Sequence, residues 1–194
     1  MNAYGPSFFD IVPNKLALRY ATIPNGDWHK YFTSKINLKL HDNKGNPELA
    51  NIFGVTDGTE YPGAGSQLPA LFIQPNSMLL KACMAFDTET KCLPFSKAVE
   101  ADTWFWVRFE QNKWEDGNTY FYALLCDEKN ENCDYQGKIQ NFTPQDFTGV
   151  KPYIGNTYEQ DDIVAASGEY FDFELWSSEL ISDLTYSLTE EPTV

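Results

Sequence analysis

Apolar and polar residues alternate in a succession of short runs along most of the 194-residue chain. The runs are rich in Val, Ile, Phe, Tyr and Trp, and Gly-, Asn-, Asp- and Pro-containing stretches separate them. Alternation with a period of two is typical of β-strands, and frequent turns between short strands are typical of an antiparallel β-sandwich. We expect strands at residues 7–12, 15–21, 29–41, 48–57, 67–74, 77–86, 91–98, 104–111, 119–126, 133–142, 150–156 and 168–177.

Helical spacing occurs in one place only, near the end of the chain. Leu180, Ile181, Leu184 and Leu188 recur at near-helical intervals behind serines that could cap a helix. The pattern therefore predicts a short C-terminal helix within residues 177–188. A chain of this length is expected to form one domain, which we place at 1–188, with a flexible acidic tail at 189–194.

The stretch TWFWVRFEQNKWEDGNTYFYALLC, residues 103–126, predicts a hairpin that is apolar on both faces. A strand with one dry and one wet face should alternate apolar and polar residues, so something must cover the second face. On the first arm, alternation places Trp104, Trp106 and Arg108 on one face, and Phe105, Val107 and Phe109 on the other.

The register of the second arm is open, because a slip of one residue exchanges the two faces. With Val107 and Phe109 inward, we expect Tyr122 and Leu124 inward too, which leaves Phe121 and Leu125 beside Trp106. A glycan, a flat apolar ligand, another protomer, a long loop or the C-terminal segment could cover this surface. The predicted ligand-binding residues are Trp104, Trp106, Arg108, Phe121, Leu125 and Trp114.

The net charge of −14, from 28 acidic and 14 basic residues, excludes whole classes of partner. Nucleic-acid binding and docking on anionic membranes both need clustered Lys and Arg, and the sequence has no such cluster. No apolar stretch approaches the ~18 residues of a membrane-inserted helix. The first residues lack the basic and apolar regions of a signal peptide, so the chain is either cytosolic or a mature secreted form.

The four cysteines favour the secreted form. Cys83 and Cys92, and likewise Cys126 and Cys133, flank short polar inserts that read as hairpin turns. Such pairing predicts two disulfides, Cys83–Cys92 and Cys126–Cys133. Four free thiols in a cytosolic protein are the alternative. Asn141 begins the glycosylation sequon Asn-Phe-Thr, although the proline that follows would weaken its use.

Three segments resemble a known superfamily. They are GSQLPALFI at 65–73, the WFWVRF strand feeding TYFYALLC, and FTGVKPYIG at 147–155 before the strand that begins at Gly168. Over residues 30–177 this order is similar to laminin-G-like domains, and more broadly to the concanavalin A-like lectin/glucanase superfamily. The resemblance implies a jelly roll of two curved antiparallel sheets. It also implies ligands on the concave sheet or on rim loops, with Ca²⁺ as the candidate metal.

Catalysis is not expected. Glucanases of this superfamily carry a Glu-x-Asp-x-(x)-Glu strand, and the nearest run here is Glu169-Tyr-Phe-Asp172-Phe-Glu174. Simple alternation places Asp172 and Glu174 on one face and Glu169 on the other, which is wrong for a catalytic set. The two histidines suggest no catalytic triad, and paired cysteines leave no thiol nucleophile.

Candidate calcium ligands lie in two loops. Asp57 and Glu60 precede the Pro-Ala strand, while Asp161 and Asp162 follow Ile154-Gly155. Hard cations prefer clustered carboxylates and carbonyls on loops, and both loops could approach one rim. Ordinary surface acids are the alternative reading.

Together these features predict a secreted, non-catalytic, lectin-like module that binds a glycan through an aromatic sheet face and rim loops. The alternative is an extracellular structural or carrier protein that uses the same face for self-assembly or for an extended apolar molecule. Polar neighbours around the aromatic residues favour a lectin, and Leu or Phe neighbours favour the carrier.

Overall fold

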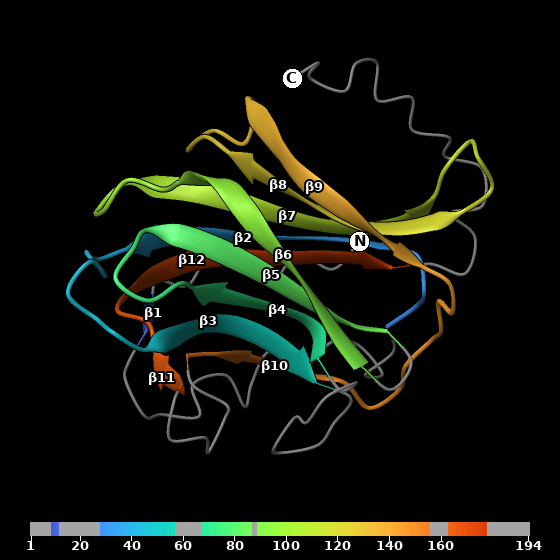
Figure 1. The fold of residues 1–194 in the computed structure, drawn as a ribbon, viewed down its shortest axis with the longest axis horizontal. Helices are drawn as coiled ribbons and strands as arrows, with labels where there is room; N and C mark the ends of the chain where they lie inside the picture. The colour runs from blue at the N-terminus through green and yellow to red at the C-terminus, as the bar shows by residue number, and fades with distance from the viewer. Residues whose placement is uncertain (1–8, 12–27, 57–66, 87–88, 156–162, 178–194) are drawn as a thin grey trace.

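The computed structural model describes residues 9–11, 28–56, 67–86, 89–155 and 163–177, which form an all-β sandwich (Figure 1). The predicted C-terminal helix, the acidic tail and the strand expected at 15–21 lie outside these residues. The described strands are β1 Phe9–Ile11, β2 Phe32–Leu40, β3 Leu49–Thr56, β4 Gln67–Ile73, β5 Leu79–Phe86, β6 Glu89–Ala98, β7 Trp104–Lys113, β8 Thr119–Cys126, β9 Cys133–Asn141, β10 Lys151–Ile154, β11 Ile163–Ala165 and β12 Gly168–Ser177.

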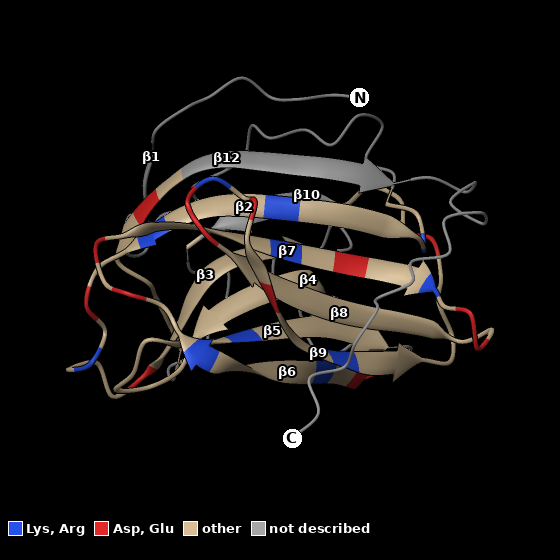
Figure 2. Cartoon of the chain, turned by 90° about the horizontal axis from the view of Figure 1, so that it is seen from above, with Lys and Arg blue, Asp and Glu red and all other residues tan. Residues whose placement is uncertain are grey.

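The strands form two sheets that pack face to face (Figures 1 and 2). The first sheet has the order β1-β12-β2-β7-β8-β9, and the second has the order β10-β3-β4-β5-β6. The predicted antiparallel sandwich of two sheets is confirmed, with one exception. The strand β11, which sequence alternation did not predict, pairs in parallel with β3. Because β11 is only three residues long, it carries too little alternation to be recognised.

The core lies between the inner faces of the two sheets. Phe53 of β3, Phe109 of β7 and Phe121 of β8 form a stack across it, with ring centroids 6.4 and 6.3 Å apart. All three are fully buried, as is Trp28, whose backbone bridges to Phe147. Burying large aromatic side chains removes much apolar surface from water, which is the main driving force for this fold.

Prolines occupy positions where a missing N–H does little harm. Pro94 lies in β6, an edge strand of the second sheet, and Pro69 lies in β4 where the pairing with β3 shifts register. A proline removes one ladder hydrogen bond, so edges and bulges are where sheets tolerate it. The positions of these two prolines therefore explain why two runs that contain a proline still form strands.

The open edges of the two sheets meet where β6 lies beside β9. Gln136 Oε1 accepts hydrogen bonds from Ser96 N and Ser96 Oγ at 3.1 and 3.3 Å, and Lys97 Nζ lies 2.6 Å from Asp134 Oδ2. Gly137 faces Leu93 so closely that an added Cβ would lie 2.7 Å from Leu93 Cδ1. A glycine is favoured here, since its φ of +136° also disfavours other residues.

Both predicted disulfides are confirmed. Cys83–Cys92 joins the paired strands β5 and β6, and Cys126–Cys133 joins β8 and β9. Each bridge connects residues that lie directly opposite each other in the strand register. Within the described part of the chain, no helix is long and apolar enough to cross a membrane.

Candidate functional site

The first sheet presents an outer face that is aromatic and polar at the same time. We define this outer face by the alternate residues of four strands that point away from the core: Lys35, Asn37 and Lys39 of β2, Trp104, Trp106, Arg108, Glu110 and Asn112 of β7, Tyr120, Tyr122 and Leu124 of β8, and Tyr135, Lys138 and Gln140 of β9. Figure 2 looks onto it and shows Lys and Arg on the strands and most acidic residues in the loops around them.

The register of the β7–β8 hairpin corrects the sequence prediction for β8. Val107 pairs with Leu125, and Gln111 pairs with Phe121, so both β8 residues face the core. Phe121 is fully buried and Leu125 is 7% exposed. The prediction that they lie beside Trp106 was wrong, because the turn fixes a register in which Tyr122 and Leu124 point outward instead. The predicted division of β7 into two faces is confirmed.

A buried carboxylate organises the middle of the outer face. Glu110 is 2% exposed and forms an ion pair with Arg108, whose Nη2 lies 2.6 Å from Glu110 Oε1. Its other oxygen accepts hydrogen bonds from Tyr122 Oη at 2.5 Å and from Asn112 Nδ2 at 3.3 Å. A buried charge is tolerated only when it is paired and hydrogen-bonded, and these three partners meet that need. The network fixes the orientation of Tyr122 in the sheet.

The β8–β9 loop, residues 127–132, covers one end of the outer face. Trp106 is 9% exposed, and its Nε1 donates a hydrogen bond to the carbonyl oxygen of Glu128 at 3.1 Å. Lys35 Nζ lies 5.1 Å from the centre of the Trp106 ring. Part of the predicted aromatic surface is therefore covered by a loop of the chain itself.

Asp127 holds this loop in its folded shape. One of its carboxylate oxygens accepts the N–H of Glu131, and the other accepts Asn132 Nδ2. These hydrogen bonds, the one from Glu131 first, hold the pKa of Asp127 below its ordinary value. The Cys126–Cys133 disulfide closes the base of the same loop.

The other end of the outer face is an aromatic cluster around Trp114, in the β7–β8 turn. The Trp114 ring lies 5.2 Å from that of Tyr120 and 5.9 Å from that of Tyr122, both at steep angles. Lys138 Nζ lies 3.8 Å from the centre of the Trp114 ring. The hydroxyl of Tyr120 donates to Asp116 Oδ2 at 2.8 Å, and this bond raises the pKa of Tyr120.

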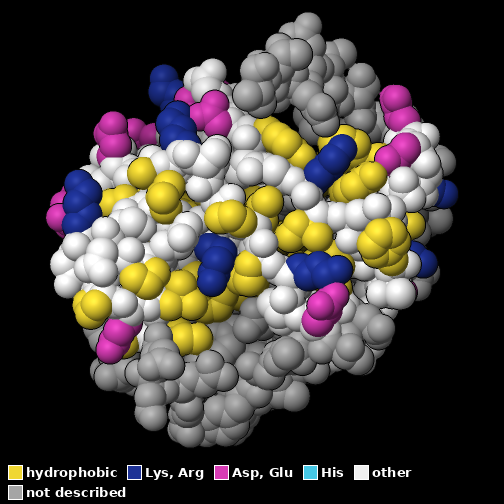
Figure 3. All heavy atoms as spheres, in the orientation of Figure 1, with side chains coloured by type: hydrophobic (Ala, Val, Ile, Leu, Met, Phe, Trp, Pro, Cys, Tyr) yellow, Lys and Arg dark blue, Asp and Glu magenta, His cyan; other side chains and the backbone are white. Residues whose placement is uncertain are grey.

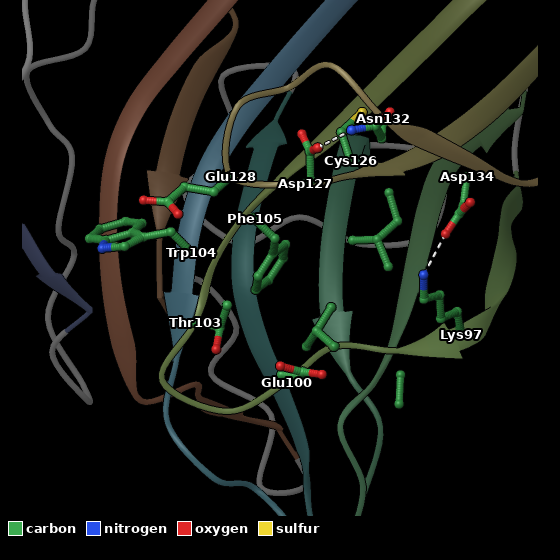
Figure 4. A pocket seen from close by; sticks show the side chains of 13 residues that line it. Lys97, Glu100, Thr103, Trp104, Phe105, Cys126, Asp127, Glu128, Asn132 and Asp134 are labelled. Carbon is green, nitrogen blue, oxygen red and sulfur yellow. Dashed lines mark hydrogen bonds and ion pairs between the residues drawn. The ribbon is translucent and has the colours of Figure 1, made fainter.

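A pocket of about 420 Å³ lies beside Trp104, between the β6–β7 turn and the β8–β9 loop (Figure 4). Its apolar wall consists of Val99, Phe105 and Leu125. The polar groups around it are Lys97, Glu100, Thr103, Asp127, Glu128, Asn132 and Asp134. In the close view, Glu128 lies next to Trp104 on one side, and the Lys97–Asp134 pair lies on the other. The volume falls in the range of small-ligand sites.

The six predicted ligand-binding residues are thus divided among five settings. Phe121 is in the core, and Trp106 lies under the 127–132 loop. Trp104 and Leu125 line the pocket, Arg108 belongs to the Glu110 network, and Trp114 forms the far aromatic cluster. Sequence reasoning missed Glu110, Tyr122 and Lys138. Alternation could have placed Glu110 beside Arg108, but Lys138 reaches Trp114 only through the pairing of β8 with β9, which the sequence does not show.

The strand β12 departs from simple alternation. Its pairing with β2 shifts between Tyr170 and Asp172, so that Glu169 lies opposite Lys39 and Asp172 lies opposite Asn37. The paired residues of β2, Lys39 and Asn37, both belong to the outer face, so the bulge brings the register positions of Glu169 and Asp172 onto one face of the sheet. The prediction that Glu169 lies on the opposite face from Asp172 was therefore wrong, and the spacing argument against catalysis does not hold. Glu169 Oε1 itself lies 2.6 Å from Lys39 Nζ.

Two other predicted sites have different outcomes. Asn141 is 4% exposed and its Nδ2 donates to Gln111 Oε1 at 2.8 Å, so attaching a glycan to that nitrogen would require the side chain to leave its buried position. The candidate calcium ligands Asp57, Glu60, Asp161 and Asp162 lie outside the described residues. Among the described residues, no group of three or more His, Cys, Asp or Glu side chains is placed to hold a metal ion.

Comparison with known proteins identifies the fold. No family model and no curated protein matches the sequence. A native heptameric SAP-like pentraxin from Limulus polyphemus is 13% identical, with a TM-score of 0.50 over 78% of this chain and 65% of the pentraxin. An endo-β-1,4-glucuronan lyase from the fungus Trichoderma reesei is 14% identical, with a TM-score of 0.53 over 91% of this chain and 76% of the lyase.

The binding domain of botulinum neurotoxin DC, in complex with SialylT, is 14% identical, with a TM-score of 0.50 over 80% of this chain and 34% of that structure. This chain thus spans less than two thirds of the pentraxin and about a third of the toxin structure. The three similar structures are jelly-roll sandwiches of the concanavalin A-like type. At these identities the likeness shows the fold alone, and the predicted jelly-roll sandwich is confirmed.

Proposed function

We propose that this protein is an extracellular, non-catalytic, lectin-like module that binds a glycan along the outer face of the first sheet. The binding surface runs from the pocket beside Trp104 to the aromatic cluster around Trp114. Its role is recognition, and the ligand contacts are ring stacking together with hydrogen bonds to sugar hydroxyls.

The observation that carries this proposal is that the aromatic side chains are surrounded by polar and charged side chains. On the outer face, Trp104, Tyr120 and Tyr122 lie among Lys, Arg, Asn, Gln and Glu side chains, because the neighbouring Phe residues and Leu125 turn into the core. Leu124 is the one leucine among the residues that define this face. A sugar presents an apolar C–H face and a rim of hydroxyls. It is therefore matched by flat rings that have polar groups at their edges.

The same observation disfavours the carrier and self-assembly alternative. That alternative depended on Phe121 and Leu125 lying beside Trp106, and both are in the core. Figure 3 shows another side of the molecule, where apolar side chains form separate patches with Lys and Arg between them. Large apolar contact surfaces are usually more continuous than this.

The extracellular location rests on the two disulfides, which persist in oxidising compartments and are rare in the cytosol. The fold also supports the proposal, since the compared structures include a glucuronan lyase and a toxin domain in complex with SialylT. At 14% identity this support extends only to the suitability of the scaffold.

A glycan array followed by calorimetry on the best ligands tests the proposal. We expect Trp104→Ala and Tyr120→Ala each to weaken binding at least about tenfold, which corresponds to the loss of one stacking contact. The matched control is Phe142→Ala, since Phe142 is 75% exposed and is not part of the outer face. Failure of the folded protein to bind any glycan, or equal weakening by the control, would contradict the proposal.

The non-catalytic part needs its own measurement. Polysaccharides that bind should remain intact on long incubation with the protein. New reducing ends would indicate hydrolysis, and new ultraviolet-absorbing unsaturated ends would indicate elimination. Either product, if lost in a Glu169→Gln or Asp172→Asn variant, would make the protein an enzyme.

A further inference from the structure

Lys138 differs from two other cations of the outer face in how its charge is balanced. Arg108 is paired with Glu110, and Lys39 is paired with Glu169. No ion pair of Lys138 occurs among the described residues. Its Nζ lies 3.8 Å from the centre of the Trp114 ring and 4.6 Å from that of Tyr120.

Aromatic contacts leave the hydrogen-bonding capacity of this ammonium group unused. A lysine has three N–H donors, and a ring face attracts the charge without supplying an acceptor of ordinary strength. Asp116, an acid of the turn, accepts hydrogen bonds from Asn118 N at 2.8 Å and from the hydroxyl of Tyr120. These bonds, with a smaller contribution from the charge of Lys138, lower the pKa of Asp116, but the two side chains form no ion pair. Lys138 is therefore positioned by the rings and retains donors for an anion.

Two further polar atoms at this end of the face lack partners. Trp114 Nε1 has no acceptor, and Asn112 Oδ1 has no donor, among the described residues. Asn112 is 2% exposed and pairs with Tyr120 across the strands. A buried polar atom without a partner costs free energy in the unliganded protein. Since both atoms are inaccessible to solvent, they do not themselves face a ligand, and the inference rests on Lys138.

We propose that the glycan bound by the outer face is acidic, and that Lys138 pairs with a carboxylate or sulfate group on the sugar that occupies the Trp114 end. This inference rests on the proposed glycan-binding function and specifies its ligand class. In this arrangement the anion accepts from Lys138 Nζ, while the sugar lies against the rings of Tyr120 and Trp114.

Because the whole molecule is acidic, a preference for an acidic glycan has to come from a cation at the binding site. With a net charge of −14, the protein repels polyanions at long range, so a polyanion gains nothing from general attraction. Binding of an acidic glycan would therefore depend on a specific cation. Figure 2 shows that the strands of the outer face carry Lys and Arg residues, whereas the loops carry most of the acidic residues.

The experiment compares matched ligands that differ only in charge. β-1,4-Glucuronan oligosaccharides and β-1,4-glucan oligosaccharides share a backbone and differ in the C6 carboxylate. Sulfated and desulfated galactan oligosaccharides form the second pair. Calorimetry on the intact, oxidised protein should give at least tenfold tighter binding for the acidic member of one pair, and the pair that responds identifies the anion.

Three variants attribute the preference to Lys138. Lys138→Gln should remove the preference for the acidic ligand and leave affinity for the neutral one within about twofold. Lys138→Arg should retain the preference, because it retains the charge. Lys44→Gln is the control, since Lys44 is an exposed lysine of the β2–β3 loop. Thermal melts confirm that each variant is folded.

The outcomes separate this inference from the proposed function. If neutral and acidic sugars bind equally, or if Lys138→Gln leaves an acidic preference intact, the inference is wrong while glycan binding stands. If no sugar binds at all, both the inference and the proposed function are wrong. A lost preference in Lys138→Gln that Lys138→Arg restores supports the inference.

Discussion

Trp106 shows how a single residue can belong to a sheet face and still be buried. It points away from the core, yet the 127–132 loop covers it and accepts its indole N–H. We expect Trp106→Ala to destabilise the fold by about 2–4 kcal/mol, slightly less than a tryptophan between two sheets would. Trp106→Phe should cost about 1 kcal/mol, since it keeps most of the packing and loses one hydrogen bond. Chemical denaturation measures both values, and a cost near zero for the alanine variant would show that the loop does not cover Trp106.

Asp127 gives the covering loop a dependence on pH. Its pKa is lowered in the folded protein, so its stabilising contribution is present above the ordinary aspartate pKa and is lost as the pH falls through the lowered value. We therefore expect Trp106 fluorescence to shift to the red below about pH 4. Asp127→Asn has one acceptor oxygen in place of two, so its emission should be shifted already at neutral pH. Trp106→Phe, which lacks the reporting indole, is the control and should show no such shift, and an unchanged neutral spectrum of Asp127→Asn would contradict the role of Asp127.

Sequence reasoning succeeded where one face of a strand is clearly apolar. The division of Trp104, Trp106 and Arg108 from Phe105, Val107 and Phe109 follows from alternation alone. It failed on β8, where both faces are apolar or aromatic and the pattern is the same in either register. Only the length of the turn, which pairs Lys113 with Thr119, decides which face is inside.

At the scale of elements, the β8–β9 hairpin depends on its disulfide. Cys126 and Cys133 are 7 residues apart, and closing such a loop stabilises the fold by about 2–3 kcal/mol. We expect the double variant Cys126→Ala/Cys133→Ala to lose this amount and also to expose Trp106, because the covering loop loses its closed base. The matched control is Cys83→Ala/Cys92→Ala, which should lose similar stability without a change in Trp106 emission. Melting curves measure the loss of stability in both variants, and an equal change in Trp106 emission in the two would contradict this difference.

The strand β12 marks the limit of prediction for elements. Its bounds follow well from the sequence, but the bulge after Tyr170 does not, since no glycine or proline interrupts the run from Glu169 to Ser177. The site shows the same limit. Its aromatic residues are visible in the sequence, whereas the pocket and the contact between Lys138 and Trp114 arise from pairings between strands and loops that alternation does not encode.

For the whole molecule, the meeting of β6 and β9 determines whether the sandwich closes. Gly137→Ala would bring a Cβ to 2.7 Å from Leu93 at a positive φ, so we expect a loss of about 1–3 kcal/mol. Gly45→Ala is the control, because an added Cβ there meets no atom within 4 Å. Thermal melts of the two variants provide the comparison, and equal melting temperatures would show that this contact adapts at no cost.

Both disulfides lie within single hairpins, and neither joins one sheet to the other. Each loop is short, so its closure requires only the local strands and none of the distant contacts of the core. During synthesis, each bridge can therefore form as soon as its own hairpin has emerged, before the remaining strands exist. Oxidation then needs no shuffling among cysteines, and once it is complete no disulfide joins the two sheets, which are held together by packing and by the polar contacts between β6 and β9.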